Sequence, residues 1–192
     1  MKLHRLTICI TVLALVTISC SRQVSLPVLP VGGDFTLTDD TGHAFTLSSL
    51  RGKAVLVFFG YTSCPDACPT TLSKLSSVYR RLGADAKRVK TLYITVDPGR
   101  DTPEALKADL ANFKVDALGL TGAKADIDKV VKQYGAAYEI VPAPDSYAKY
   151  TVSHTTTVYA LDTSGRTRIL FDYDTKADDI VNGIREILAS SS

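Results

Sequence analysis

The strongest constraint on the fold is a pair of uninterrupted apolar runs that flank one amphipathic stretch. The runs are KAVLVFFGY at 53–61 and TLYITVD at 91–97. Their β-branched and aromatic content predicts strands that are buried on both faces of a sheet. Between them, apolar residues recur at helical spacing and a glycine follows: Leu72, Leu75, Val78, Tyr79, Leu82 and then Gly83. This order predicts a βαβ unit whose two strands are parallel and joined by a right-handed crossover.

The remaining patterns extend this unit into an α/β domain. We expect a hairpin at 34–47, helices at 102–113 and around 127–134, antiparallel strands at 156–162 and 166–173, and a final helix through 180–188. This plan predicts a thioredoxin-like fold, with a mixed central sheet flanked by helices and an extra N-terminal β-hairpin. A Rossmann-like sheet is the alternative, but no G-x-G-x-x-G motif follows the first buried strand.

The first twenty residues have the pattern of an export signal. A basic start, MKLHR, precedes an uncharged run at 6–18 that is too short to span a bilayer as a helix. The TISC stretch ending at Cys20 resembles a bacterial lipobox, although Thr17 is atypical there. We therefore predict a lipoprotein-type signal peptide at 1–19, a tether at 20–32 and the folded domain at 33–192. Simple secretion and an uncleaved anchor are the alternatives.

This organisation predicts an exported lipoprotein, anchored to a membrane through the lipid on Cys20 and facing the periplasm or cell exterior. A chain of 192 residues fits one domain of ordinary size. Its net charge is only +2, and no run of lysine and arginine is present. Nucleic acid is therefore not an expected partner.

Two cysteines remain in the mature domain, Cys64 and Cys68, within GYTSCPDACPTTL at 60–72. They are predicted to lie where the first buried strand ends and the helix begins, at the strand edge where α/β domains place ligands. The positive end of a helix favours thiolates over thiols. Residues four apart on a helix share one face, about 6 Å apart, so the pair can form a disulfide when oxidised or direct both sulfurs at one ion.

A metal at this pair needs a third ligand. Two soft sulfurs favour Cu(I), zinc or iron–sulfur chemistry, but two ligands satisfy neither trigonal copper nor tetrahedral zinc. The mature chain offers His43, in the predicted hairpin, and His154, just before a predicted core strand. In a thioredoxin-like sheet the loop before that strand approaches the cysteine helix, so His154 is the candidate. The alternative for His154 is a structural hydrogen-bonding role.

Three segments resemble, in order, the motif blocks of the Sco/SenC family over roughly residues 33–189. They are FFGYTSCPDACPTTL at 58–72, VDPGRDTPEAL at 96–106 and YTVSHTTTVYALDTSG at 150–165. Members of that family are membrane-tethered, thioredoxin-like copper proteins that assist assembly of the CuA centre of cytochrome c oxidase. The resemblance implies copper, as Cu(I), Cu(II) or both, bound by Cys64, Cys68 and His154.

Two further positions of the blocks bear on the metal site. Asp97 matches a family position near the metal, so the resemblance implies a supporting role; turn chemistry shared with Asp101 is the alternative. Family members often have an acidic residue immediately before the histidine, whereas this chain has Ser153. That departure weakens the expectation of a carboxylate partner for the imidazole but removes no ligand.

Two functions fit this site. The first is a copper chaperone, not a conventional enzyme, that delivers copper to the CuA-bearing subunit of cytochrome c oxidase or exchanges it with another copper carrier. The second is a thiol–disulfide reductase that uses Cys64 and Cys68 as its redox pair to maintain a partner's cysteines. A peroxidase is disfavoured because the peroxidatic cysteine of peroxiredoxins lies in a Thr-x-x-Cys pattern, whereas Thr62 is only two residues before Cys64. A purely structural disulfide is disfavoured because so short a loop gains little from closure.

Overall fold

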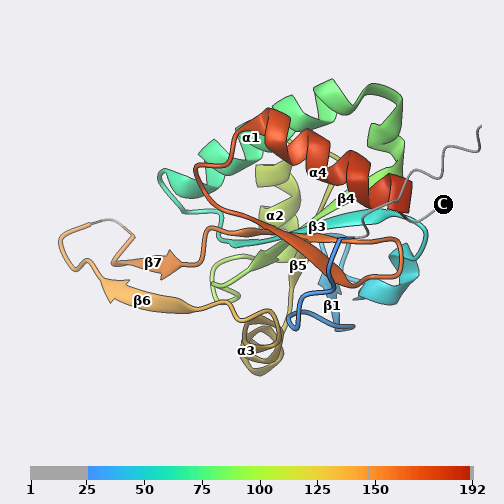
Figure 1. Ribbon diagram of the computed structural model, residues 1–192. Coiled ribbons are helices and arrows are strands. Elements are labelled where there is room, and N and C mark those ends of the chain that lie inside the picture. Colours follow the sequence, from blue (N-terminus) through green and yellow to red (C-terminus); the bar gives the residue numbers. More distant parts are fainter. Residues whose placement is uncertain (1–25, 147, 191–192) are drawn as a thin grey trace, which may run out of the picture.

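The computed structural model describes residues 26–146 and 148–190. The predicted signal peptide and Cys20 lie outside them. Within this part of the chain the strands are β1 (Thr36–Asp39), β2 (Ala44–Thr46), β3 (Ala54–Gly60), β4 (Val89–Thr95), β5 (Ala117–Thr121), β6 (Tyr138–Pro142), β7 (Tyr150–His154), β8 (Val158–Leu161) and β9 (Thr167–Phe171). The α-helices are α1 (Ala67–Leu82), α2 (Pro103–Leu110), α3 (Lys124–Gln133) and α4 (Ala177–Ser190) (Figure 1).

The predicted βαβ unit forms the centre of the molecule. β3 and β4 pair in parallel along their whole length, and α1 connects them. Gly83 ends α1 with a φ of 58°, a left-handed conformation that glycine adopts without strain. On the other side of β3, β8 pairs antiparallel and continues into β9. The main sheet has the order β2-β1-β5-β4-β3-β8-β9, which confirms the predicted mixed sheet and thioredoxin-like fold.

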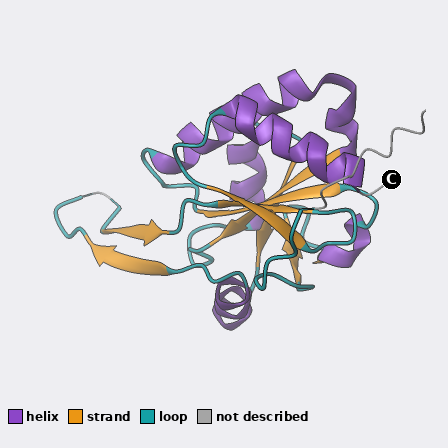
Figure 2. Ribbon diagram, viewed as in Figure 1, coloured by secondary structure: helices purple, strands orange, loops and turns teal. Residues whose placement is uncertain are grey.

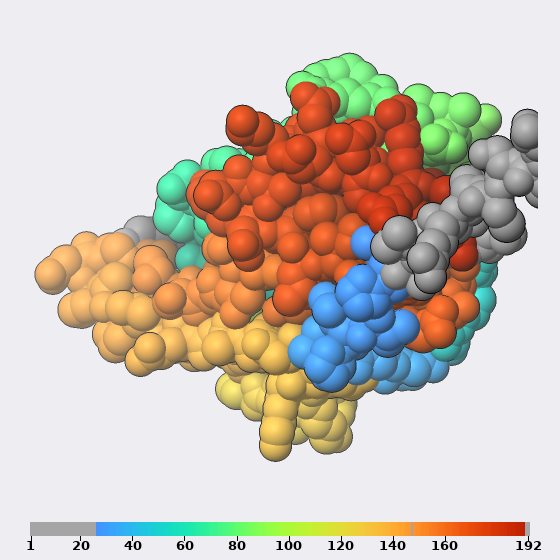
Figure 3. All heavy atoms as spheres, viewed as in Figure 1, coloured from blue at the N-terminus to red at the C-terminus, as the bar shows by residue number. Residues whose placement is uncertain are grey.

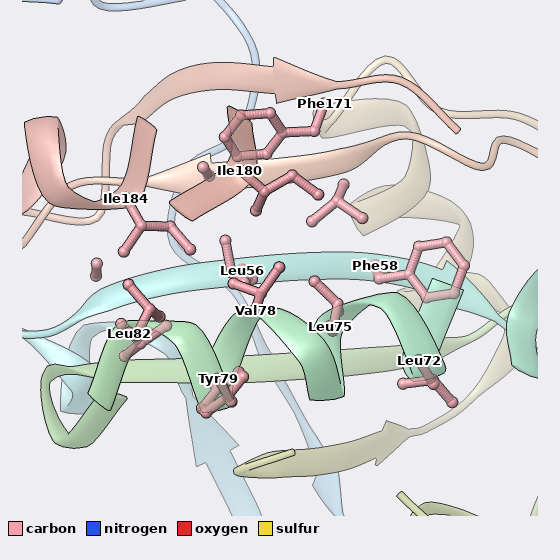
Figure 4. Close-up of a cluster of buried hydrophobic side chains, with 14 of the residues drawn as sticks. Leu56, Phe58, Leu72, Leu75, Val78, Tyr79, Leu82, Phe171, Ile180 and Ile184 are labelled. Carbon is pink, nitrogen blue, oxygen red and sulfur yellow. The ribbon is translucent and has the colours of Figure 1, made fainter. Parts of the chain in front are cut away.

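Helices α1, α2 and α4 cover one face of the central sheet and α3 covers the other, as Figure 2 shows. Because side chains alternate along a strand, Leu56 and Phe58 of β3 join the cluster under α1 and α4, which Figure 4 draws. Val57 and Phe59 point to the opposite face and join the cluster under α3. All four side chains are buried, and each buried side chain of this size contributes about 1.5–3 kcal/mol of hydrophobic stabilisation.

The N-terminal hairpin was predicted correctly, and the helix that begins after Thr102 was predicted correctly at its start only. The predicted N-terminal hairpin is present as antiparallel β1 and β2, and β1 joins the main sheet through β5. The predicted helix at 102–113 is shorter, because α2 ends at Leu110. Its start was predicted correctly: Thr102 caps the helix by accepting a hydrogen bond from the Ala105 N–H.

A second, two-stranded sheet was not predicted. β6 and β7 form an antiparallel hairpin that extends away from the main sheet (Figure 1) and forms a projecting lobe in the space-filling view (Figure 3). His154 is the last residue of β7, and Tyr138 of β6 lies opposite it. The expectation that His154 occupies a loop was therefore wrong in detail, although it does precede core strand β8.

The described part of the predicted tether, residues 26–32, lies against the domain. The Leu29 N–H donates to the Thr167 carbonyl at 2.9 Å, and the Gly32 N–H donates to the Gln133 carbonyl at 2.8 Å. The Arg168 guanidinium donates to the carbonyls of Leu26 and Pro27. Across the described residues, every helix is too short or too polar to cross a lipid bilayer.

Candidate metal centre

The two cysteines lie at the junction between β3 and α1. Cys64 belongs to the loop that precedes α1, and Cys68 belongs to the first turn of that helix. The four-residue spacing had suggested that both cysteines lie on one face of the helix. This expectation was wrong, because Cys64 precedes the helix. Instead, the Cys68 N–H at the helix start donates to the Cys64 sulfur at 3.4 Å. The N-terminal amides of α1 thus supply positive potential to Cys64. Asp66 occupies the N-cap position but makes no capping hydrogen bond with its side chain.

Gly60, the last residue of β3, leaves the space that Cys68 occupies. A β-carbon at position 60 would lie 2.8 Å from Cys68 Sγ and 2.6 Å from the hydroxyl oxygen of Tyr93. Real β-carbons do not approach other heavy atoms so closely, so any larger residue would displace one of the two groups. The glycine of the GYTSC segment is therefore explained by the close approach of the sulfur to the strand.

His154 brings the third donor atom to the cysteines from β7. Its Nε2 atom lies 3.5 Å from Cys68 Sγ and 3.9 Å from Cys64 Sγ. Its Nδ1 atom lies 3.0 Å from the carbonyl oxygen of Thr155. Since a carbonyl only accepts hydrogen bonds, this contact requires a proton on Nδ1, and Nε2 is the ring nitrogen that faces the two sulfurs.

Two aromatic rings fix the orientation of the imidazole. Tyr61 and Phe58 both lie edge-on to the His154 ring, with centroid distances of 5.8 Å and 6.2 Å and interplanar angles of 90° and 72°. Both rings come from β3 or its end, so the strand that leads to the cysteines also supports the histidine. Tyr61 is part of the GYTSC segment, but its role was not evident without the fold.

The two thiols have opposite electrostatic environments. A hydrogen bond from Cys68 lowers the pKa of Cys64 well below its ordinary value, and contacts with His154 and backbone N–H groups act in the same direction. The same hydrogen bond and burial raise the pKa of Cys68 far above its ordinary value. Cys64 is partly exposed and Cys68 is buried. In the reduced pair, loss of a proton is therefore favoured at the partly exposed Cys64 and disfavoured at the buried Cys68.

Buried Asp101 ties the cysteine loop to the sheet. Its carboxylate accepts hydrogen bonds from the Thr62 N–H at 3.0 Å, the Thr62 hydroxyl at 2.6 Å and the Thr95 hydroxyl at 2.6 Å. The sequence prediction had assigned Asp101 only to turn chemistry. Its place in VDPGRD at 96–101 was the available signal, but the contact with Thr62 requires the parallel pairing of β3 and β4.

The other candidate residues have different surroundings. Asp97 is buried, and its carboxylate contacts Arg100 and Tyr150. Its carbonyl also accepts from the Asp101 N–H at 3.0 Å, so the predicted turn is present too. His43 lies on the exposed β1–β2 turn, where Nδ1 is 2.9 Å from the Thr41 hydroxyl. The structure does not bring His43 to the cysteines.

Among the described residues, the three predicted ligands form one cluster of side chains that could hold a metal ion. The donor atoms of Cys64, Cys68 and His154 all lie within 4.8 Å of one another. A groove of about 350 Å³ between the cysteine loop and β7 exposes one side of this cluster. The molecule is thus a thioredoxin-like domain with an accessible Cys-Cys-His centre, whose two sulfurs and one nitrogen suit a soft ion such as Cu(I) or Zn²⁺.

Comparison with known proteins gives the family. A model described as SCO1/SenC matches residues 25–189. The chain is 35% identical over 155 residues to a SCO2-like protein of Rickettsia conorii. This alignment covers 81% of this chain and 76% of that protein. This chain therefore belongs to the SCO1/SenC family.

Solved structures agree with this assignment. Copper-bound ScoI of Bradyrhizobium japonicum matches with a TM-score of 0.74 and 41% identity, covering 82% of this chain and 99% of that one. Copper-bound ScoI of Arabidopsis thaliana matches with a TM-score of 0.76 and 30% identity, covering 82% and 98%.

Proposed function

We propose that this chain binds one copper ion through Cys64, Cys68 and His154 and delivers it to the CuA centre of cytochrome c oxidase. The observation that carries the proposal is the convergence of two sulfurs and one imidazole nitrogen within 4.8 Å. Copper is favoured over zinc because the two ScoI relatives were solved with copper bound. The carboxylate-free donor set also suits a soft ion.

Cu(I) and Cu(II) differ in how many ligands they need at this site. Two thiolates hold Cu(I) in a low-coordinate geometry, whereas Cu(II) prefers additional ligands that include nitrogen. His154 faces both sulfurs with Nε2, so it supplies that nitrogen from its place at the end of β7. Copper binding also releases protons, because the ligands bind as thiolates.

The position of the tether supports delivery to a partner beyond the membrane surface. Thr167, which holds the tether, is opposite Leu161 of β8, and Leu161 is opposite Val55 near the start of β3. The cysteines follow the other end of β3. A lipid on Cys20 would therefore attach the domain at the end away from the metal groove, which leaves the groove open to a copper carrier or the CuA-bearing subunit.

The second candidate function is reduction of a partner's disulfide, and the asymmetry of the two thiols favours it. The partly exposed Cys64, as its thiolate, would attack the partner disulfide and release one partner thiolate. Cys68, after losing its proton, would displace the second partner sulfur from the mixed disulfide. The partner gains two electrons, and the chain ends with a Cys64–Cys68 disulfide.

The experiment that separates the two functions replaces His154 in cells grown at limiting copper. Delivery from the proposed three-ligand site uses the imidazole, whereas thiol–disulfide exchange needs only the sulfurs. If delivery is the function, His154→Ala loses cytochrome oxidase activity as fully as the Cys64→Ser, Cys68→Ser double variant. His43→Ala is the matched control and keeps parental activity. Normal oxidase activity in the His154→Ala strain would overturn the proposal that copper is delivered from the three-ligand site.

A further inference from the structure

The hairpin that carries His154 needs to be held in place. β6 and β7 pair with each other and do not join the main sheet. We propose that Arg100, together with Asp97 and Tyr150, forms a latch that fixes β7 against the cysteine loop and so positions His154 for Cu(II). The inference rests on the proposed copper function, and Arg100 acts as a positioning residue and not as a ligand.

The latch joins the loop after β4 to the first residue of β7. The Arg100 guanidinium forms an ion pair with one carboxylate oxygen of Asp97. The Tyr150 hydroxyl donates to the other oxygen of Asp97 at 3.0 Å. The Arg100 guanidinium also lies 3.7 Å from the centre of the Tyr150 ring, within cation–π range. One oxygen of the buried carboxylate thus binds Tyr150 of β7, and the other binds Arg100, which stacks on the same tyrosine.

Arg100 also bridges a strained turn of the hairpin. Lys149 has a φ of 62° and is the non-glycine residue with positive φ in the described part of the chain. Such a conformation costs about 1–2 kcal/mol for a residue with a β-carbon. Arg100 Nη1 lies 3.3 Å from the carbonyl oxygens of Ala148 and Tyr150, which flank Lys149. The guanidinium therefore stabilises the turn that sets the direction of β7.

Tyr61 connects the latch to the metal centre. Its ring centre lies 5.7 Å from the Arg100 guanidinium carbon and 5.8 Å from the His154 ring centre. Its hydroxyl accepts a hydrogen bond from the Val152 N–H at 3.3 Å. Arg100, Tyr61 and β7 are thus in continuous contact up to the imidazole, so displacement of the latch moves His154 relative to the sulfurs.

The latch predicts an unequal effect on the two copper valences. Arg100→Met keeps the length of the side chain but removes the ion pair and all three donated hydrogen bonds. Loss of a group that orients a metal ligand commonly lowers metal affinity by about 10–100-fold. We therefore expect Arg100→Met to lower Cu(II) affinity by about tenfold or more. Cu(I) affinity should change by less than about threefold, because both thiolates remain.

Competition titrations with Cu(II) and Cu(I) test this directly, and exchange of the Val152 amide hydrogen tests it without metal. Exchange should be faster in metal-free Arg100→Met than in the parent. Arg166→Met is the matched control, because Arg166 pairs with buried Asp162 at the opposite end of β8. Tyr150→Phe keeps the stacked ring and removes only the bond to Asp97, so it should lower Cu(II) affinity less than Arg100→Met.

Parental Cu(II) affinity in folded Arg100→Met would overturn the latch, and so would an equal loss of both valences. If Arg100→Met does not fold, the Cu(II) affinity of Tyr150→Phe decides by the same criterion. If the parent chain itself binds no copper, the proposed function fails. The latch is then tested by amide exchange alone. Faster exchange of the Val152 amide hydrogen in Arg100→Met than in Arg166→Met supports it, and equal exchange overturns it.

Discussion

Cys64 is the residue at which the electrostatics of the site can be measured most simply. Its pKa is lowered, first by the hydrogen bond from Cys68, so the thiolate persists as the pH falls. An ordinary thiol loses about 80-fold in thiolate fraction between pH 8 and pH 6. We predict that the iodoacetamide alkylation rate of Cys64 changes by less than about twofold over this range.

Mass mapping of the alkylated reduced protein measures that rate for each cysteine separately. Cys68→Ala is the informative control, because it removes the largest cause of the lowered pKa and should restore a steeper dependence on pH. A Cys64 rate in the parent that rises nearly tenfold per pH unit would contradict the account.

Gly60 tests how closely Cys68 approaches β3. Gly60→Ala places a β-carbon 2.8 Å from Cys68 Sγ, so the strand or the helix start has to shift. Overpacking of this kind costs about 1–3 kcal/mol, which denaturant unfolding measures. Gly99→Ala is the control, because its β-carbon would meet only Asp97 Oδ1, at 3.9 Å. Equal stability of the two variants would show that the sulfur does not constrain position 60.

The sequence identified the three candidate ligands that the structure brings together, but not the groups that support them. Cys64 and Cys68 are close in the chain, and His154 precedes a recognisable core strand. Arg100, Tyr61 and Tyr150 carry no such signal, because their contacts join three segments that are remote in sequence. Only the pairing of β3 with β4 and the course of β7 bring these side chains together.

At the scale of elements, prediction succeeded where burial imposes a pattern. β3 and β4 are apolar runs because helices cover both of their faces. β5 was missed because ALGLT at 117–121 is short and contains Gly119, which a strand interior disfavours. The β6–β7 hairpin was missed because Glu139 to Pro142 are exposed, so no alternation of buried and exposed residues marks the strand.

Asp101 connects the cysteine loop to strand β4 of the sheet by hydrogen bonds to Thr62 and Thr95. Asp101→Ala leaves the Thr62 N–H and the hydroxyls of Thr62 and Thr95 without their acceptor. Loss of such a buried network costs about 3 kcal/mol in the free energy of unfolding. Asp116→Ala removes a half-exposed partner of Lys90 and should cost less than about 1 kcal/mol. Comparable losses in the two variants, measured by denaturant unfolding, would contradict this role.

At the scale of the whole molecule, Arg168 fixes the end opposite the metal groove. It pairs with buried Asp162 at 2.8 Å and donates to the carbonyls of Leu26 and Pro27. Arg168→Ala should release this segment, because a hydrogen bond to a charged group contributes about 1.5–3 kcal/mol. Elastase, which cleaves after small aliphatic residues, should then cut after Val28 or Val31 about tenfold faster.

Arg166→Ala is the control for that cleavage, since Arg166 contacts Asp162 but not the two tether carbonyls. Unchanged cleavage in Arg168→Ala would mean that the tether is held by other contacts. The orientation proposed for the anchored domain would then lose its support.

Copper titration of the reduced protein decides whether Cys64, Cys68 and His154 together bind copper. The account predicts one copper per chain and, for Cu(II), a sulfur-to-copper charge-transfer absorption that requires Cys64 and Cys68. It also predicts that His154→Ala loses Cu(II) affinity far more than Cu(I) affinity, because two thiolates still suffice for Cu(I). If the Cys64→Ser, Cys68→Ser double variant keeps that absorption, the metal centre assigned to this chain is wrong.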